Sequence, residues 1–140
     1  LMCYQTTGMR QKIYTHDGYT IIEDCYNASP ESVKAELAVL SALAGEKHGR
    51  ALAVLGDMLE LGDASLSEHV EVLEKAQICA SEIIVVGDEF SKAARGGLNV
   101  QCFPDVESLK AHIASNPIKG RTILIKGSHG MHLERLTEVL

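Results

Sequence analysis

Three short apolar runs constrain the fold of this chain more than any other feature. They cover residues 50–55, 82–86 and 122–126, and a glycine follows each of them. A strand with one face in water alternates apolar and polar side chains, whereas a strand buried on both faces reads as a continuous apolar run. The three runs therefore predict the central strands of a parallel sheet.

Segments with helical spacing separate these runs. Residues 29–45 begin with Ser-Pro, a typical N-cap and first helical position, and then carry apolar residues at intervals of three and four. Ser65 and Glu68 predict a capping box at the start of a second helix, whose buried face should include Leu66 and Leu73.

The remaining elements follow the same alternation. We expect a short helix at residues 90–95, a strand at 100–103, a helix at 105–114 and a closing helix at 131–140. Because right-handed crossovers place helices on both faces of a parallel sheet, the pattern predicts an α/β fold. The expected architecture is a three-layer, Rossmann-like sandwich with a mostly parallel sheet.

The start of the chain predicts a short β-ribbon or linker that precedes this sandwich. Residues 9–15 and 19–23 are rich in apolar side chains and flank His-Asp-Gly, and Asp-Gly is a favoured hairpin turn. The first residue is Leu, and the chain opens within a plausible strand. We therefore expect a piece of a longer protein.

Composition narrows the class of protein. A chain of 140 residues with 46% apolar content is long enough for one domain with a core. Its net charge of -6 disfavours binding to nucleic acid, and no apolar run approaches the roughly 20 residues that a membrane-spanning helix needs. The four cysteines are widely spaced, which favours a reducing cytoplasm over a disulfide framework.

Candidate binding residues lie where the predicted strands end, because ligands of open α/β sheets bind at the carboxyl ends of the strands. Asp24, Tyr26 and Asn27 follow the first such strand and precede a helix N-terminus, a combination that suits sugar hydroxyls or an adenine edge. The alternative is a turn in which Asp24 and Asn27 only close the connection between strand and helix.

Residues 126–131 (Lys-Gly-Ser-His-Gly-Met) place a cation, a hydroxyl and approachable backbone ahead of the closing segment, which suits a carboxylate or phosphate. A turn with Ser128 as an N-cap is the alternative. Asp57 lies in an acidic, glycine-bounded loop, which suits an amine or a metal-bound group, and the alternative is a loop that only faces solvent. His129 and His132 lack a third metal ligand nearby, so we predict no metal site.

The sequence lacks the common phosphate-binding and nucleophile motifs. It contains no Gly-x-x-x-x-Gly-Lys-[Ser/Thr] loop, no Gly-x-Gly-x-x-Gly after a strand and no Gly-x-Ser-x-Gly elbow. We therefore expect no catalytic residues within this chain and no catalysis by the chain alone.

Three segments, taken in order, resemble the C-terminal domain of Mur ligases. They are residues 24–32 (Asp-Cys-Tyr-Asn-Ala-Ser-Pro-Glu-Ser), 55–62 (Leu-Gly-Asp-Met-Leu-Glu-Leu-Gly) and 125–131 (Ile-Lys-Gly-Ser-His-Gly-Met). The first two look most like the branch of the family that joins D-Ala-D-Ala to UDP-N-acetylmuramoyl-tripeptide. The resemblance spans nearly the whole chain.

This resemblance implies a domain organisation and an activity. Residues 1–18 would be the end of a central ATPase domain and its linker, and residues 19–140 the C-terminal domain. The family's first domain holds the UDP-sugar, and its central domain carries the phosphate loop and Mg²⁺. The last domain closes over ATP and brings D-Ala-D-Ala. The full-length protein is thus expected to be a cytoplasmic, ATP-dependent ligase of peptidoglycan precursors that acts through an acyl phosphate.

The resemblance also implies roles for nucleotide-binding residues. Asp24 resembles the residue that holds the ATP ribose, and Arg10 resembles a linker arginine that contacts the nucleotide when the domain closes. Tyr26 and Asn27 would line the adenine side.

On the substrate side, Ser128 with the backbone of Gly127 and His129 resembles the stretch that faces the incoming amino acid, where it would receive the dipeptide carboxylate. Lys126 would add positive charge, and Asp57 is placed on the same side. His129 stands where such ligases often have Arg, so its charge depends on pH.

Two other functions remain open at this stage. A related amide ligase, similar to folylpolyglutamate synthase, would differ in the acceptor rather than in the chemistry. A non-catalytic α/β interaction module would show the same alternation of strands and helices, because fold alone does not fix function. Such a receiver-like module needs an acidic cluster at the first strand end, where this chain has only Asp24.

Overall fold

Within the described residues, seven strands form one mixed sheet in the order β1-β2-β3-β7-β4-β5-β6. The computed structural model describes residues 2–5, 12–16, 19–24, 28–45, 51–96, 100–118 and 121–140. The strands are β1 (Met2–Gln5), β2 (Lys12–His16), β3 (Tyr19–Asp24), β4 (Ala51–Gly56), β5 (Glu82–Val86), β6 (Gln101–Phe103) and β7 (Thr122–Lys126). The five strands from β3 to β6 in this order are parallel, whereas β1 and β2 pair antiparallel.

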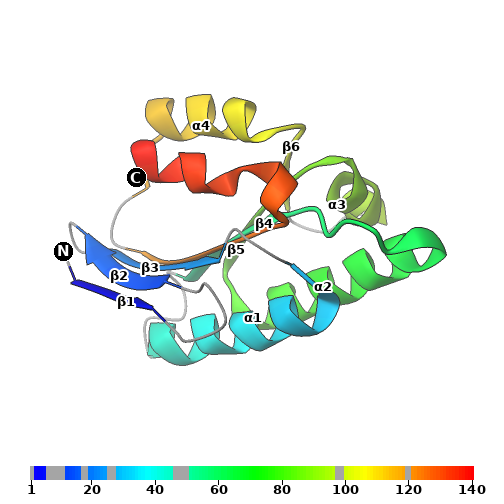
Figure 1. Cartoon of the computed structure of the whole chain (residues 1–140), viewed down its shortest axis with the longest axis horizontal. Coiled ribbons are helices and arrows are strands. Elements are labelled where there is room, and N and C mark those ends of the chain that lie inside the picture. The colour runs from blue at the N-terminus through cyan, green and yellow to red at the C-terminus, as the bar shows by residue number, and fades with distance from the viewer. Residues whose placement is uncertain are drawn as a thin grey trace.

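Helices cover both faces of the sheet, as the sequence predicted. They are α1 (Pro30–Ala44), α2 (Ser65–Cys79), α3 (Asp88–Ala93) and α4 (Val106–Ser115). Helices α1 and α2 lie side by side on one face, while α4 and the C-terminal segment lie on the other (Figure 1). The three-layer α/β sandwich is therefore confirmed.

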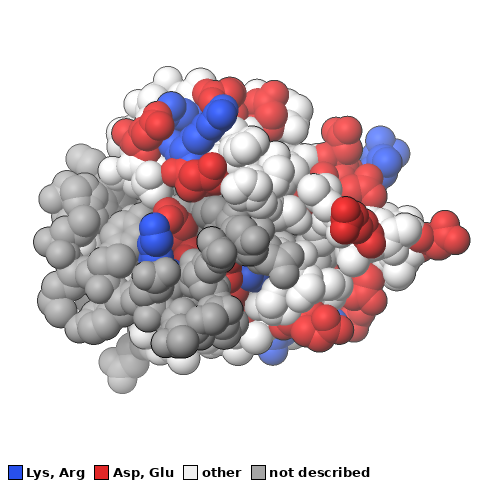
Figure 2. Space-filling model, viewed as in Figure 1, with Lys and Arg blue, Asp and Glu red and all other residues white. Residues whose placement is uncertain are grey.

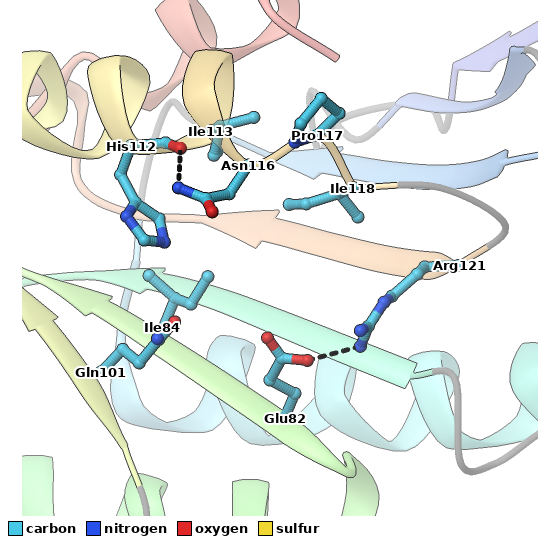
Figure 3. Close-up of a pocket in the computed structure, with 9 residues that line it drawn as sticks. All are labelled: Glu82, Ile84, Gln101, His112, Ile113, Asn116, Pro117, Ile118 and Arg121. Atoms are coloured by element: carbon cyan, nitrogen blue, oxygen red, sulfur yellow. Dashed lines mark hydrogen bonds and ion pairs between the residues drawn. The ribbon is translucent and has the colours of Figure 1, made fainter.

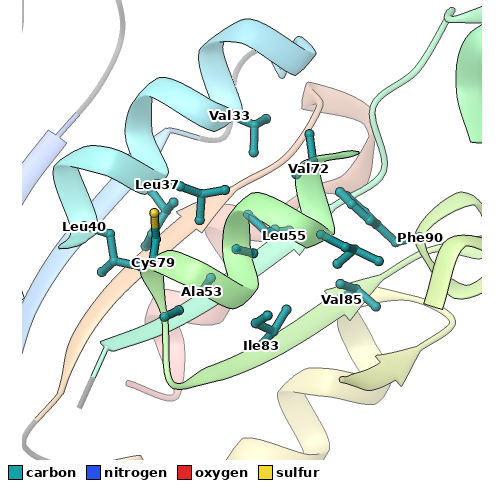
Figure 4. Close-up of a cluster of buried hydrophobic side chains, with 14 of the residues drawn as sticks. Val33, Leu37, Leu40, Ala53, Leu55, Val72, Cys79, Ile83, Val85 and Phe90 are labelled. Atoms are coloured by element: carbon teal, nitrogen blue, oxygen red, sulfur yellow. The ribbon is translucent and has the colours of Figure 1, made fainter. Parts of the chain in front are cut away.

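Each face of the sheet has its own apolar core. In one core, Leu37 of α1 and Val72 of α2 pack with side chains of β4 and β5, among them Val85 (Figure 4). The other joins the opposite face to α4 and the C-terminal segment. All six residues of β4 are buried, which is the physical reason why this strand lacks polar alternation.

Side chains define the helix starts at two places. Ser29 accepts a hydrogen bond from the backbone N–H of Ser32, whose hydroxyl in turn accepts from the Ser29 N–H, so the predicted helix start is confirmed as a capping box. Asp105 caps α4 by accepting from the Ser108 N–H at 2.8 Å, and this bond lowers the pKa of the Asp105 carboxyl.

The capping box predicted at Ser65 is wrong. The N-cap of α2 is Ala64, and Ser65 is the first helical residue, with its hydroxyl donating to the Glu89 carboxylate at 2.6 Å. Leu73 is buried as predicted, but Leu66 is 57% exposed and His69 is fully buried, so the buried face of α2 is rotated from the prediction. Packing against α1 and α3 selects this face over the one that includes Leu66.

The predicted closing helix is also wrong in type. The chain forms two short 3-10 segments, His129–Met131 and Leu133–Glu138, joined at His132 with a φ of 54°. Leu133 and Leu136 are both buried. Residues three apart lie on the same line of a 3-10 helix, so this spacing suits a 3-10 segment as well as an α-helix.

The predicted hairpin at the start of the chain is confirmed. Strands β2 and β3 pair antiparallel with His16 opposite Tyr19, while the connecting residues 17–18 lie outside the described residues. Both strands belong to the same sheet, and the domain boundary expected at residues 18/19 stays a prediction. None of the helices in the described ranges has the length and apolar character needed to cross a bilayer.

Two glycines allow the strand ends of β4 and β7 to approach closely. A Cβ added to Gly127 would lie 2.8 Å from Leu133 Cδ1 and 3.1 Å from the Gly56 Cα. A Cβ added to Gly130 would meet only Leu59 Cδ1, at 3.6 Å. Backbone cannot move aside as a side chain can, so the first position is intolerant of a methyl group.

We therefore predict that Gly127→Ala lowers the free energy of unfolding by about 1–3 kcal/mol, as overpacking typically does. Gly130→Ala is the matched control and should change it by less than about 0.5 kcal/mol. Urea unfolding followed by circular dichroism measures both. Equal stability of the two variants would contradict the close approach of the two strand ends.

Candidate functional site

The carboxyl ends of four neighbouring strands bring most of the predicted site residues to one edge of the sheet. Asp24 ends β3, and residues 126–128 end β7 directly beside it. The backbone N–H of Gly127 donates to the Asp24 carbonyl at 3.4 Å, and the N–H of Asp57 donates to the Val86 carbonyl at 3.1 Å. Residues that are up to about a hundred positions apart thus share one edge.

Lys126 forms the most buried charged cluster of this edge. Its Nζ lies 3.0 Å from Asp24 Oδ2 and 2.5 Å from Glu36 Oε2, and all three residues are less than 5% exposed. A buried ammonium is tolerated only when it is paired, so the two carboxylates compensate its charge. The positive charge of Lys126 is therefore used inside the domain to hold Asp24, and a direct contact with substrate stays a prediction.

Glu36 is a site residue that sequence reasoning missed. It lies on α1 at a position that continues the apolar spacing of Val33, Leu37 and Leu40, which places it on the buried face. A carboxylate on the buried face of an amphipathic helix requires a cation beneath it. That signal was present in the sequence, but the partner could not be identified before the sheet order was known.

Ser128 connects the end of β7 to the loop that follows β4. Its Oγ accepts a hydrogen bond from the Leu59 N–H at 3.3 Å, and the residue is 8% exposed. The alternative role as an N-cap is not observed, because the Ser128 side chain makes no capping bond to the 3-10 segment that follows. Within the described residues the Ser128 hydroxyl donates to no acceptor, and its predicted contact with substrate stays a prediction.

Asp57 has a structural role that the sequence did not indicate. Its two carboxylate oxygens accept from the Glu89 N–H at 3.0 Å and the Phe90 N–H at 2.9 Å, the first turn of α3. Gly87 adjoins this carboxylate with a φ of 113°, and a Cβ there would fall 2.3 Å from Asp57 Oδ2. With both oxygens engaged, Asp57 anchors the loop to α3, and the predicted contact with substrate remains untested.

His69 is a second buried residue that sequence reasoning missed. Its Nε2 lies 3.0 Å from the Met58 N, its Nδ1 lies 2.7 Å from the Ser65 carbonyl oxygen, and its ring meets Phe90 edge to face. Position 69 is four residues after Ser65, and the apolar spacing pointed to Val70 instead. Only the packing of α2 shows that the histidine faces inward.

The outer edge of this network carries a perturbed carboxylate. Glu89 accepts a hydrogen bond from the Ser65 hydroxyl and pairs with Lys92 at 3.2 Å. The Ser65 bond and then the Lys92 bond lower the pKa of the Glu89 carboxyl, and desolvation opposes them. Helices α2 and α3 are thereby tied together beside the loop.

Three candidate nucleotide-binding residues, Arg10, Tyr26 and Asn27, lie outside the described residues. His129 is described and exposed, with its ring 5.9 Å from that of His132. Within the described ranges, His, Cys, Asp and Glu side chains form no group of three or more that would hold a metal ion.

A pocket of about 480 Å³ lies at the opposite end of the strands. Glu82 and Arg121 form an ion pair of 2.6 Å on one side of it, and His112 and Asn116 of the α4 end line the other (Figure 3). The pocket is thus separate from the strand-end residues.

Surface charges of both signs are interspersed on the face shown in Figure 2. Lys and Arg lie there beside Asp and Glu over α4 and the C-terminal segment, where Arg135 pairs with Glu107.

Two solved MurF ligases share the fold of this chain. A crystal structure of MurF from Acinetobacter baumannii superposes with a TM-score of 0.75 at 29% identity, over 96% of this chain and 30% of that one. The MurF ligase from Thermotoga maritima in complex with ADP has a TM-score of 0.76 at 26% identity, over 97% and 31%.

Sequence relatives agree with this likeness. The UDP-N-acetylmuramoyl-tripeptide--D-alanyl-D-alanine ligase of Bacillus subtilis (strain 168) is 36% identical over 97% of this chain, which spans 31% of that relative's length. The family described as "Mur ligase, glutamate ligase domain" matches residues 9–129. The predicted membership is thereby confirmed, and the chain belongs to the Mur ligase family.

Proposed function

We propose that this chain is the C-terminal domain of an ATP-dependent ligase that adds D-Ala-D-Ala to UDP-N-acetylmuramoyl-tripeptide. The observation that carries the proposal is the 36% identity, across 97% of the chain, to a ligase of that name. The chain spans about a third of that relative's length, so the activity is proposed for the longer protein that contains it. We propose that such a protein acts in the cytoplasm.

In the proposed reaction, the terminal carboxylate of the tripeptide takes the γ-phosphoryl group of ATP, and the dipeptide amine then displaces phosphate through a tetrahedral intermediate. The enzyme's contribution is largely positioning and charge neutralisation. The sequence of this chain has no phosphate loop, and its described residues offer no acidic cluster for a metal. We therefore assign the triphosphate and Mg²⁺ to the central domain of the same protein.

The nucleotide side of the site is assigned to Asp24. Lys126 holds one oxygen of its carboxylate, Oδ2, at 3.0 Å, while Oδ1 accepts from no donor within the described residues. A carboxylate fixed by one oxygen presents the other in a constant direction, which suits a pair of ribose hydroxyls. Arg10, Tyr26 and Asn27 are proposed to complete the nucleotide contacts.

The acceptor side is assigned to residues 127–129. The Ser128 hydroxyl accepts from the Leu59 N–H and keeps its own proton for an incoming carboxylate. The exposed His129 follows it, and the backbone of Gly127 adjoins Gly56. Asp57 and Lys126 contribute by fixing the surrounding loop and strand end rather than through exposed charge.

One prediction from the proposed function concerns the isolated chain. Because the proposed triphosphate site lies in another domain, the purified 140-residue chain should neither hydrolyse ATP nor ligate D-Ala-D-Ala. Phosphate release should stay at background, whereas the full-length ligase turns over under the same conditions. Turnover of ATP by the chain at the rate of the full-length enzyme would contradict the proposal.

A second prediction concerns Asp24 in the full-length ligase. Asp24→Ala should raise the KM for ATP roughly tenfold or more, because hydrogen bonds to a charged acceptor are lost. Glu36→Gln is the matched control, since it alters the other carboxylate on Lys126 but lies within α1. It should lower stability while leaving the KM for ATP within about twofold. An unchanged KM in Asp24→Ala would remove this residue from the nucleotide site.

A third prediction concerns the acceptor. Ser128→Ala should raise the KM for D-Ala-D-Ala about tenfold and leave that for ATP nearly unchanged, because one charge-assisted hydrogen bond is lost. Ser91→Ala is the control, as the hydroxyl of this half-buried serine donates to the Gly87 carbonyl of its own helix start. Steady-state kinetics with D-Ala-D-Ala, L-Ala and glutamate as acceptors also identifies the amine that the ligase uses.

A further inference from the structure

His69 is a buried polar residue that is not among the residues assigned to substrate. It is fully buried, and both of its ring nitrogens are hydrogen-bonded. A backbone N–H can only donate, so Nε2 must accept from Met58. The ring is therefore neutral, with its proton on Nδ1 and shared with the Ser65 carbonyl. The edge-to-face contact with Phe90, at 4.5 Å between centroids, fixes the ring plane.

The bond from His69 fixes a peptide that adjoins the acceptor site. Met58, whose N–H it accepts, is followed by Leu59, whose own N–H donates to Ser128 Oγ. The next residue, Glu60, has a φ of 63°, which is disfavoured for a residue with a side chain. Such a conformation persists only when its surroundings determine it, and the two anchored amides provide that restraint.

We propose that His69 is a positioning residue for Ser128, acting through the backbone of Met58 and Leu59. The Leu59 N–H occupies one lone pair of the Ser128 hydroxyl and thereby directs its proton away from the loop, towards the acceptor carboxylate. Without the acceptor at His69 Nε2, the Met58 N–H would be buried and unsatisfied, and the loop would shift to find another partner. This inference rests on the acceptor role proposed above for Ser128.

Glutamine and leucine distinguish positioning from simple packing. A glutamine at position 69 extends far enough to present its amide oxygen to the Met58 N–H, so His69→Gln should preserve the restraint. Leucine fills the core but has no acceptor, so His69→Leu should abolish it. Val72→Ala is the control for lost stability, because Val72 is fully buried on the same helix and contributes no polar group to the loop.

The experiment measures KM for D-Ala-D-Ala and for ATP in the full-length ligase. We expect His69→Leu to raise the dipeptide KM about five- to tenfold, the size of one lost hydrogen bond, with the ATP KM within about twofold. His69→Gln should lie near wild type. In a Ser128→Ala background, His69→Leu should add less than about twofold, because the group that it positions is gone. Val72→Ala should lower the unfolding temperature without changing either KM.

Two results would overturn the proposal. One is a double variant in which the His69 and Ser128 effects multiply independently, and the other is an equal rise of both KM values in His69→Leu. If His69→Leu does not fold, His69→Asn replaces it, because the shorter asparagine side chain cannot reach the Met58 N–H. If His69→Asn then has the same KM for the dipeptide as His69→Gln, the proposal is contradicted. A wild-type ligase that uses another acceptor would refute the proposed function instead, and the same variants assayed with that acceptor still decide the role of His69.

Discussion

The insertion of β7 between β3 and β4 is the constraint on which the rest of the structure depends. This strand comes last in the chain, yet it pairs in parallel with both neighbours and completes the centre of the sheet. The pairing of β7 with these strands places Lys126 beside Asp24, which is 102 positions earlier in the sequence, and Gly127 beside Gly56. Contacts of such sequence separation form only when most of the chain is ordered, so the site is assembled together with the domain.

Buried hydrogen bonds and ion pairs fix the residues at the carboxyl ends of these strands. Lys126 binds two carboxylates, Asp57 binds the first turn of α3, and His69 binds the loop after β4. Each of these groups would be unfavourable in an apolar core without its partner, so each partnership restricts the local backbone to one arrangement. The two residues that we propose as ligand contacts are each held by one such bond, Asp24 by Lys126 and Ser128 by the Leu59 N–H.

How far the sequence predicted this structure can be seen at particular residues. Strands β4, β5 and β7 were predicted because burial on both faces excludes polar residues from them. Ser29-Pro30 predicted the start of α1, because few residue types can cap the free N–H groups of a first helical turn. The start of α2 was predicted wrongly, because the Ser65 hydroxyl bonds Glu89 in a neighbouring helix instead of its own backbone. The last segment was also predicted wrongly, since the spacing of Leu133 and Leu136 is compatible with two kinds of helix.

The sequence by itself determined the fold class, the order of strands and helices along the chain, and the three strand-end segments that resemble the Mur ligase family. These properties follow from local chemistry and from the period of burial, which a single chain displays directly. Only the tertiary structure decided which polar groups meet. The residues near Glu36 and His69 in the sequence do not indicate their partners. Asp57 was predicted as a loop carboxylate, but it accepts hydrogen bonds from the first turn of α3. Hydrogen bonds between distant segments depend on strand order and helix rotation rather than on neighbouring residues.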